Sequence, residues 1–321
     1  MMPILSSMEM DPKALIKAVG RGKTLSRDLT SVEMACAIRM ILGGQFTPAQ
    51  TGAFLQALRI KETTVDEVAA ALEAMVQFQQ VQATPSGAYP LVVNVAFDSK
   101  RKPTLLSVLA SRHLATLGLC SPCLVWSACL NANIPDPLAK TLSLCDGVQG
   151  LEVEVPAWSV VDLVPALEGL NALRQELGFR SILNTLEKVL RPWREAPVVL
   201  GIAHDNFRTR LAEVLLRDGS GHGAIVKGNH GTCDLGLGEE PTVVIRYGDA
   251  LVEHAVSRQD FPWESSSSIH LIASADKWPE WLSDPGSILW GAIRIQASFL
   301  LSVARPELDL AQCVELLNPS R

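Results

Sequence analysis

A change of hydrophobic pattern near residue 85 divides this sequence into two parts that must fold differently. Before it, apolar residues recur at helical spacing in short segments with clear start signals. Thr47 precedes Pro48 at a first helical position, and Thr64 is followed three residues later by Glu67, the spacing of a capping box. After it, short apolar runs alternate with helical tracts, which is the pattern of an α/β domain.

The two parts predict different elements. Four short helices are expected within residues 6–20, 30–44, 47–60 and 63–78, and they need a partner surface because they are too small to bury everything alone. Strands are expected at Leu91–Ala96, Cys123–Trp126, Val198–Ala203, Gly223–Val226, Thr242–Ile245 and Ser268–Ile272. Further helical tracts are expected at both ends of 167–192, on either side of Gly178, and over 286–304.

Composition limits the classes of protein to consider. The chain has 321 residues, 48% of them hydrophobic, which is enough for a large core in one or two domains. Its formal charge of −6 disfavours a uniformly basic protein that coats nucleic acid, although a local basic groove stays possible. No uninterrupted apolar run reaches the roughly 18 residues of a membrane span. Seven irregularly spaced cysteines and the lack of a signal-peptide pattern favour reduced thiols in the cytoplasm.

The turn between the first expected strand and the next helix carries three consecutive cations. Lys100, Arg101 and Lys102 stand where many proteins bind phosphate on a glycine-rich loop, but this turn has no glycine. The dipole and the N–H groups at the start of the following helix favour an anion there. We therefore predict phosphate contact at this turn, with a solvated basic turn as the alternative.

Four more residues follow strands at the edge where open α/β sheets bind ligands. His204 and Arg208 come after the expected strand 198–203, and Lys227 and His230 come after 223–226. We include all four in the predicted phosphate site, although an exposed arginine or a turn histidine is also explained without a ligand. His230 lacks an accompanying carboxylate or nucleophile, which disfavours a role in acid–base catalysis.

Three stretches together resemble one enzyme family. They are "LTSVEMACAIRMILGGQFTPAQTGAFLQALRIKETTVDEVAAALEAM", "ALRQELGFRSILNTLEKVLRP" and "VLGIAHDNFRTRLAEVLLRDGSGHGAIVKGNHG". The segments are similar to those of anthranilate phosphoribosyltransferase and the pyrimidine nucleoside phosphorylases, glycosyltransferase family 3. The resemblance implies a small N-terminal helical-bundle domain plus a larger α/β domain with a central mixed sheet. It places residues 1–84 in the helical domain, joined by helices from about 166–192, and residues 85–165 and 193–321 in the α/β domain.

The catalytic motifs of that family are the parts that differ. The glycine-rich turn that wraps pyrophosphate falls on "FDSKRKP", and the Lys-His-Gly-Asn motif falls within "VWSACLNANIPDPLAK". The Asp-Glu pair that holds magnesium falls on Cys233 and Asp234, so one oxygen ligand is a thiol, which suits Mg²⁺ poorly. In these departures the chain looks most like the YbiB-type branch of nucleic-acid-binding paralogues.

The resemblance also assigns two arginines. Arg174 aligns with the arginine that contacts the aromatic acid substrate, and Arg180 follows in the adjoining turn. We include both among the phosphate- or nucleic-acid-binding residues, with a structural salt bridge from Arg174 to a neighbouring glutamate as the alternative.

The expected function is therefore binding of nucleic acid, DNA or RNA and single-stranded, through phosphate contacts in a basic cleft and without a cofactor. A homodimer through the helical domain and no membrane association are expected. The alternative is an active transferase that moves phosphoribosyl from phosphoribosyl pyrophosphate to anthranilate or a related acceptor, as in tryptophan biosynthesis, with Mg²⁺ held through Asp234. A third possibility is a dimer that binds a phosphorylated small molecule.

Overall fold

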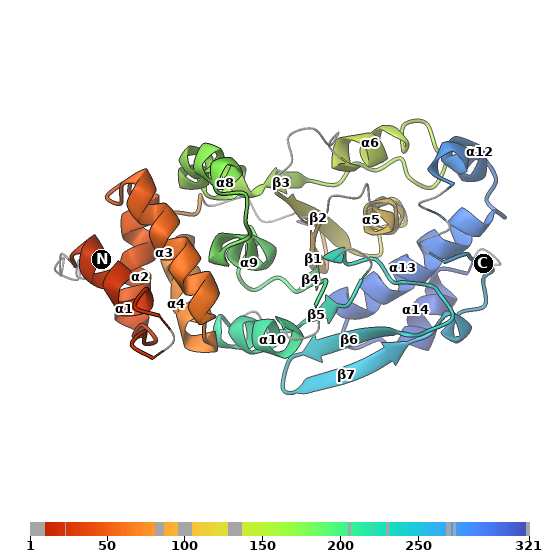
Figure 1. The fold of residues 1–321 in the computed structure, drawn as a ribbon. Helices are drawn as coiled ribbons and strands as arrows, with labels where there is room; N and C mark the ends of the chain where they lie inside the picture. The colour runs from red at the N-terminus through yellow and green to blue at the C-terminus, as the bar shows by residue number, and fades with distance from the viewer. Residues whose placement is uncertain are drawn as a thin grey trace. The chain divides into compact units, whose positions relative to one another are not determined.

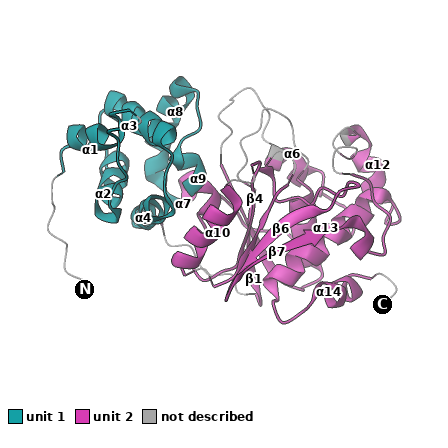
Figure 2. Cartoon of the chain, turned by 60° about the horizontal axis from the view of Figure 1, so that its bottom comes forward, with its two compact units in different colours: residues 1–79, 164–186 teal, residues 80–163, 187–321 magenta. Residues whose placement is uncertain are grey.

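The computed structural model describes residues 10–22, 24–80, 87–95, 105–127, 137–204, 207–219, 221–228, 231–267, 271 and 274–318. The chain divides into two compact units, shown in different colours in Figure 2. Unit 1 comprises residues 1–79 and 164–186, and unit 2 comprises residues 80–163 and 187–321. The expected combination of a helical bundle with an α/β domain around a mixed sheet is confirmed.

Every regular element in the described residues of unit 1 is a helix. Its elements are α1 (Pro12–Val19), α2 (Ser31–Leu42), α3 (Pro48–Lys61), α4 (Val65–Val76), the 3₁₀ helix η1 (Pro165–Leu170), α8 (Asn171–Leu177) and most of α9 (Ile182–Val189). Thr47 and Thr64 cap α3 and α4 as predicted, each accepting a hydrogen bond from the backbone N–H three residues later. Phe54 of α3 and Met75 of α4 are fully buried in the bundle.

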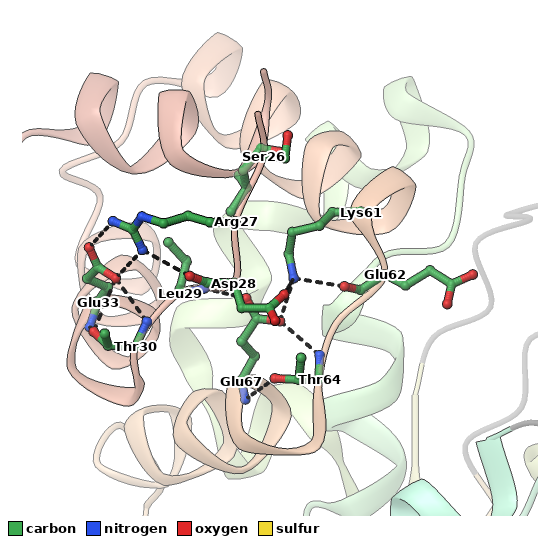
Figure 3. A network of polar contacts seen from close by, with 11 residues as sticks. Ser26, Arg27, Asp28, Leu29, Thr30, Glu33, Lys61, Glu62, Thr64 and Glu67 are labelled. Carbon is green, nitrogen blue, oxygen red and sulfur yellow. Dashed lines mark hydrogen bonds and ion pairs between the residues drawn. The ribbon is translucent and has the colours of Figure 1, made fainter. Parts of the chain in front are cut away.

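A buried carboxylate joins three segments of unit 1 (Figure 3). Glu67, in the first turn of α4, is fully buried. It accepts hydrogen bonds of 2.8 Å each from the backbone N–H groups of Leu29 and Thr64, and one from Lys61 Nζ at 2.8 Å. Lys61 also pairs with the exposed Asp28 at 2.5 Å. The end of α3, the segment that leads into α2 and the start of α4 therefore share one charged centre.

Unit 2 is built on a seven-stranded sheet with the order β3-β2-β1-β4-β5-β6-β7 (Figure 1). The strands are β1 (Pro90–Asn94), β2 (Ser121–Trp126), β3 (Ala157–Ser159), β4 (Val198–Gly201), β5 (Gly223–Val226), β6 (Thr242–Tyr247) and β7 (Leu251–Val256). The first five strands in chain order are parallel, whereas β6 runs antiparallel to both β5 and β7.

Helices cover both faces of this sheet. α5 (Leu106–Thr116) and α13 (Ile288–Ala304) pack against each other, and share a buried cluster with Val93, Val199 and Val226 of the strands. α14 (Leu310–Leu316) packs on α13, and α10 (Arg208–Arg217) packs against β5 and β6 on the opposite face. The remaining elements are α6 (Pro137–Ser143), α7 (Val160–Leu163), α12 (Trp278–Ser283), η4 (Arg258–Asp260) and η5 (Ala275–Lys277).

Five of the predicted strands are confirmed, with bounds that differ by two residues or fewer. β3 and β7 were not predicted, because β3 has only three residues and β7 is largely exposed, so neither gives an apolar run or an alternation. The strand expected at Ser268–Ile272 lies almost entirely outside the described residues. None of the helices in the described ranges has the length and hydropathy needed to cross a membrane.

The buried centre at Glu67 predicts a large loss of stability on neutralisation. In Glu67→Gln the Lys61 ammonium faces an uncharged amide, and one of the backbone N–H groups faces an amide NH₂ instead of an acceptor. We expect the free energy of unfolding to fall by about 2–4 kcal/mol. Urea denaturation measures this change in the free energy of unfolding, and hydrogen exchange of the α4 amides measures the local loss of stability.

The matched control is Glu73→Gln, on the exposed face of the same helix. A surface carboxylate contributes little, so this variant should stay within about 0.5 kcal/mol of the parent chain. Equal stabilities for Glu67→Gln and Glu73→Gln would contradict the role given to the buried centre.

Candidate functional site

The carboxyl ends of three neighbouring parallel strands form the candidate site. Asn94 of β1 pairs with Leu200 of β4, and Gly201 of β4 pairs with Val226 of β5, so the three strands end side by side. Open α/β sheets bind ligands at such an edge because the loops that follow the strands converge there. We call this region, at the ends of β1, β4 and β5, the carboxyl edge.

Two of the predicted phosphate-binding residues are exposed at the carboxyl edge. Lys227 immediately follows β5, and His204 lies three residues beyond the end of β4. Because β4 and β5 pair at their last residues, the structure brings these two segments together. The predicted residues Lys100, Arg101, Lys102 and His230 lie outside the described residues.

The turn after β5 packs directly on the end of β4. A Cβ atom on Gly201, the last residue of β4, would lie 2.1 Å from the carbonyl oxygen of Thr232 in this turn, so the position tolerates only glycine. Lys188 of α9, which the sequence did not point to, donates from Nζ to the carbonyl oxygens of Gly201 at 2.9 Å and Gly231 at 3.3 Å. This lysine therefore holds the turn against the strand end.

Asp234, the expected magnesium ligand, points into the protein. Its side chain accepts hydrogen bonds from the backbone N–H of Ser107 at 2.8 Å and of Leu106 at 3.2 Å, and the residue is only 2% exposed. Leu105, just before α5, offers no side-chain cap, so the carboxylate of Asp234, 127 residues beyond Ser107 in the chain, takes that place. The N–H groups that the sequence suggested for an external anion are already bonded to an internal one.

Burial raises the pKa of both Cys233 and Asp234, the two residues that align with the magnesium-binding pair. It raises the pKa of Asp234 to about 6, against the opposing effect of hydrogen bonds from Ser107 and Leu106. Burial, with a smaller effect of the Asp234 charge, raises the pKa of the Cys233 thiol to about 12, so the thiol stays protonated at neutral pH. A neutral thiol beside a carboxylate bonded to two N–H groups does not fit Mg²⁺, which prefers several open oxygen ligands.

The remaining predicted cations differ in their surroundings: Arg208 is paired, Arg174 is buried and Arg180 is exposed. Arg208, the first residue of α10, forms an ion pair with Glu253 of β7 at 2.9 Å and is half-buried. Arg174 of α8 is 6% exposed, and the carbonyl of Arg180 accepts a hydrogen bond from Arg59 Nη1 at 3.1 Å. Arg174 and Arg180 belong to unit 1, whereas the carboxyl edge belongs to unit 2. No group of three or more His, Cys, Asp or Glu suited to a metal occurs in the described part of the chain.

The raised pKa of Asp234 predicts a specific pH dependence of stability. A folded-state pKa raised from 3.8 to about 6 favours the folded state fully below about pH 4, and this contribution is lost as the pH rises through about 6. Asp234→Asn cannot titrate, so between pH 4 and 7 the parent should lose roughly 3 kcal/mol relative to this variant. Chemical denaturation of both proteins across this range measures the difference in the free energy of unfolding. Parallel pH profiles of the two proteins would contradict the raised pKa of Asp234.

Comparison with known proteins identifies the family. A family model described as "Glycosyl transferase family, helical bundle domain" matches residues 13–78. An uncharacterized protein of Aquifex aeolicus is 32% identical over 235 residues, covering 72% of this chain and 72% of the relative. Anthranilate phosphoribosyltransferase of Cellvibrio japonicus is 28% identical over 285 residues, covering 83% of this chain and 78% of the relative.

Solved structures share the fold at low sequence identity. Anthranilate phosphoribosyltransferase from Thermus thermophilus superposes with a TM-score of 0.72 at 20% identity, covering 95% of this chain and 92% of that one. The Saccharomyces cerevisiae enzyme in complex with PRPP and Mg gives a TM-score of 0.71 at 14% identity, covering 97% and 94%. The comparisons do not confirm the expected YbiB-type branch, but they do establish that this chain belongs to the glycosyltransferase superfamily of the anthranilate phosphoribosyltransferases.

Proposed function

We propose that this protein binds nucleic acid through phosphate contacts at the carboxyl edge and does not transfer phosphoribosyl groups. The observation that carries the proposal is the position of Asp234, whose carboxylate is buried and bonded to the first turn of α5. Its neighbour Cys233 is also fully buried. Cys233 and Asp234 therefore offer no solvent-accessible carboxylate to a metal ion.

The loss of a magnesium-binding carboxylate pair is expected to reduce catalysis more than it reduces phosphate binding. A departing pyrophosphate develops negative charge that a metal ion normally neutralises, and this stabilisation is needed in the transition state. Holding a phosphate in the ground state needs only cations within reach. A carboxyl edge without open carboxylates is thus suited to binding phosphate groups and poorly suited to expelling pyrophosphate.

The basic residues in and beside this edge support a phosphodiester ligand. Lys227 and His204 are exposed on neighbouring strand ends, and the sequence that joins β1 to α5 contains Lys100, Arg101 and Lys102. Flexible cationic side chains contact phosphodiesters without the close backbone approach that a glycine-rich turn provides. The net charge of −6 and an aromatic content of 5% favour weak, salt-sensitive binding without base stacking. Single-stranded DNA or RNA, a cytoplasmic location and a homodimer through unit 1 complete the proposal.

The proposal predicts a salt-dependent affinity for oligonucleotides that rests on the basic turn. Fluorescence anisotropy with a labelled oligothymidylate at about 50–200 mM salt should give a log affinity that falls linearly with log salt concentration. Replacing Lys100, Arg101 and Lys102 by alanine should weaken binding and reduce the slope by about 2, because each single-strand phosphate contact contributes about 0.7.

A triple alanine variant at Lys13, Lys17 and Arg21 is the matched control. These residues are exposed in and just after α1 of unit 1, and their replacement changes the net charge by the same amount. The control should keep the parent slope. Equal effects of the two triple variants would show a nonspecific charge effect and would count against the proposed site.

A second candidate function follows from the relatives. The curated relative from Cellvibrio japonicus carries the name anthranilate phosphoribosyltransferase, and the chain matches 78% of it. Under this alternative the protein would consume phosphoribosyl pyrophosphate in an anthranilate- and Mg²⁺-dependent reaction. We expect no consumption above that of a heat-inactivated sample. Turnover that is lost in Asp234→Ala would establish the transferase and overturn the proposal.

A further inference from the structure

The amino end of α5 already binds an anion, and that anion is part of the chain. Asp234 reaches the backbone N–H groups of Leu106 and Ser107 at 3.2 and 2.8 Å. α5 is 11 residues long, so its dipole and its first N–H groups together favour negative charge at this end. At 2% exposure Asp234 is almost entirely shielded from solvent.

From this arrangement we infer that Asp234 determines which phosphate ligands the carboxyl edge accepts. It fills the anion position at the start of α5, so an incoming phosphate must be held by side-chain cations and not by the helix amides. This inference deepens the proposed function and rests on it, because it assumes that phosphate groups approach the carboxyl edge.

The consequence is selectivity between two classes of phosphate. A compact, highly charged anion such as pyrophosphate depends on converging N–H donors, since it gains most from short, charge-assisted hydrogen bonds. A phosphodiester carries one charge per phosphate along a flexible chain, and separate lysines and arginines neutralise it. An internal carboxylate on the helix amides therefore excludes pyrophosphate and repels it, while it leaves the binding of a polynucleotide backbone largely unchanged.

Removing the internal anion should open the position. In Asp234→Ala the carboxylate is gone and the N–H groups of Leu106 and Ser107 lose their acceptor, whereas Asp234→Asn keeps the volume filled. The direct measurement is titration of ¹⁵N-labelled protein with sodium pyrophosphate at constant ionic strength, following the Leu106 and Ser107 amide resonances. Calorimetry with pyrophosphate and with oligothymidylate runs in parallel.

We expect Asp234→Ala to bind pyrophosphate about tenfold or more tightly than the parent, with large shifts of both amides, because two charge-assisted hydrogen bonds form. Asp234→Asn should show no such gain. Oligothymidylate affinity should change by about twofold at most in either variant, since its contacts are with side chains. Asp309→Ala, which removes the carboxylate cap of α14 in the same unit, is the control and should gain no pyrophosphate affinity.

Two results would overturn the inference. One is a folded Asp234→Ala protein whose amides do not respond to pyrophosphate. The other needs no variant, and so holds even if Asp234→Ala fails to fold: saturable shifts of Leu106 and Ser107 in the parent chain would show that the position is open. A gain of pyrophosphate affinity without any oligonucleotide binding would refute the proposed function but support this inference, so the two failures are distinguishable.

Discussion

Two hydrogen bonds between the start of α5 and the Asp234 carboxylate set the chemistry of the whole carboxyl edge. They fix the turn after β5 against the helix that follows β1, across 127 residues of sequence. They also hold a negative charge away from solvent, which is costly enough to raise the pKa of Asp234 to about 6. The same contact removes an open carboxylate from the edge and closes the helix end to other anions.

The fold was largely predictable because its signals are local. The capping residues Thr47 and Thr64 and the apolar runs of β1, β4 and β5 depend on neighbours a few residues away, and the structure confirms them. β7 was not predicted because an edge strand exposed on both faces has no hydrophobic pattern. Lys227 and His204 follow neighbouring strand ends, as their places in the sequence indicated, and phosphate binding by these two residues stays a prediction.

The contacts that define the site were not predictable, because they join residues far apart in sequence. Nothing near Asp234 indicates that its partners are the amides of Leu106 and Ser107, and nothing near Lys188 indicates that it holds the carbonyls of Gly201 and Gly231. A free helix end was therefore expected where the structure has an occupied one. Family membership does not determine the function of this site either, since one fold supports different functions through different site residues.

The proposed function requires the carboxyl edge to attract phosphate without a metal. Calorimetric titration of the full chain with phosphoribosyl pyrophosphate, with and without Mg²⁺, is the decisive experiment. Binding should be weak and no tighter with Mg²⁺, because the ion neutralises ligand charge and finds no solvent-accessible pair of carboxylates at Cys233 and Asp234. An affinity that rises about tenfold or more with Mg²⁺, and loses that rise in Asp234→Asn, would contradict it.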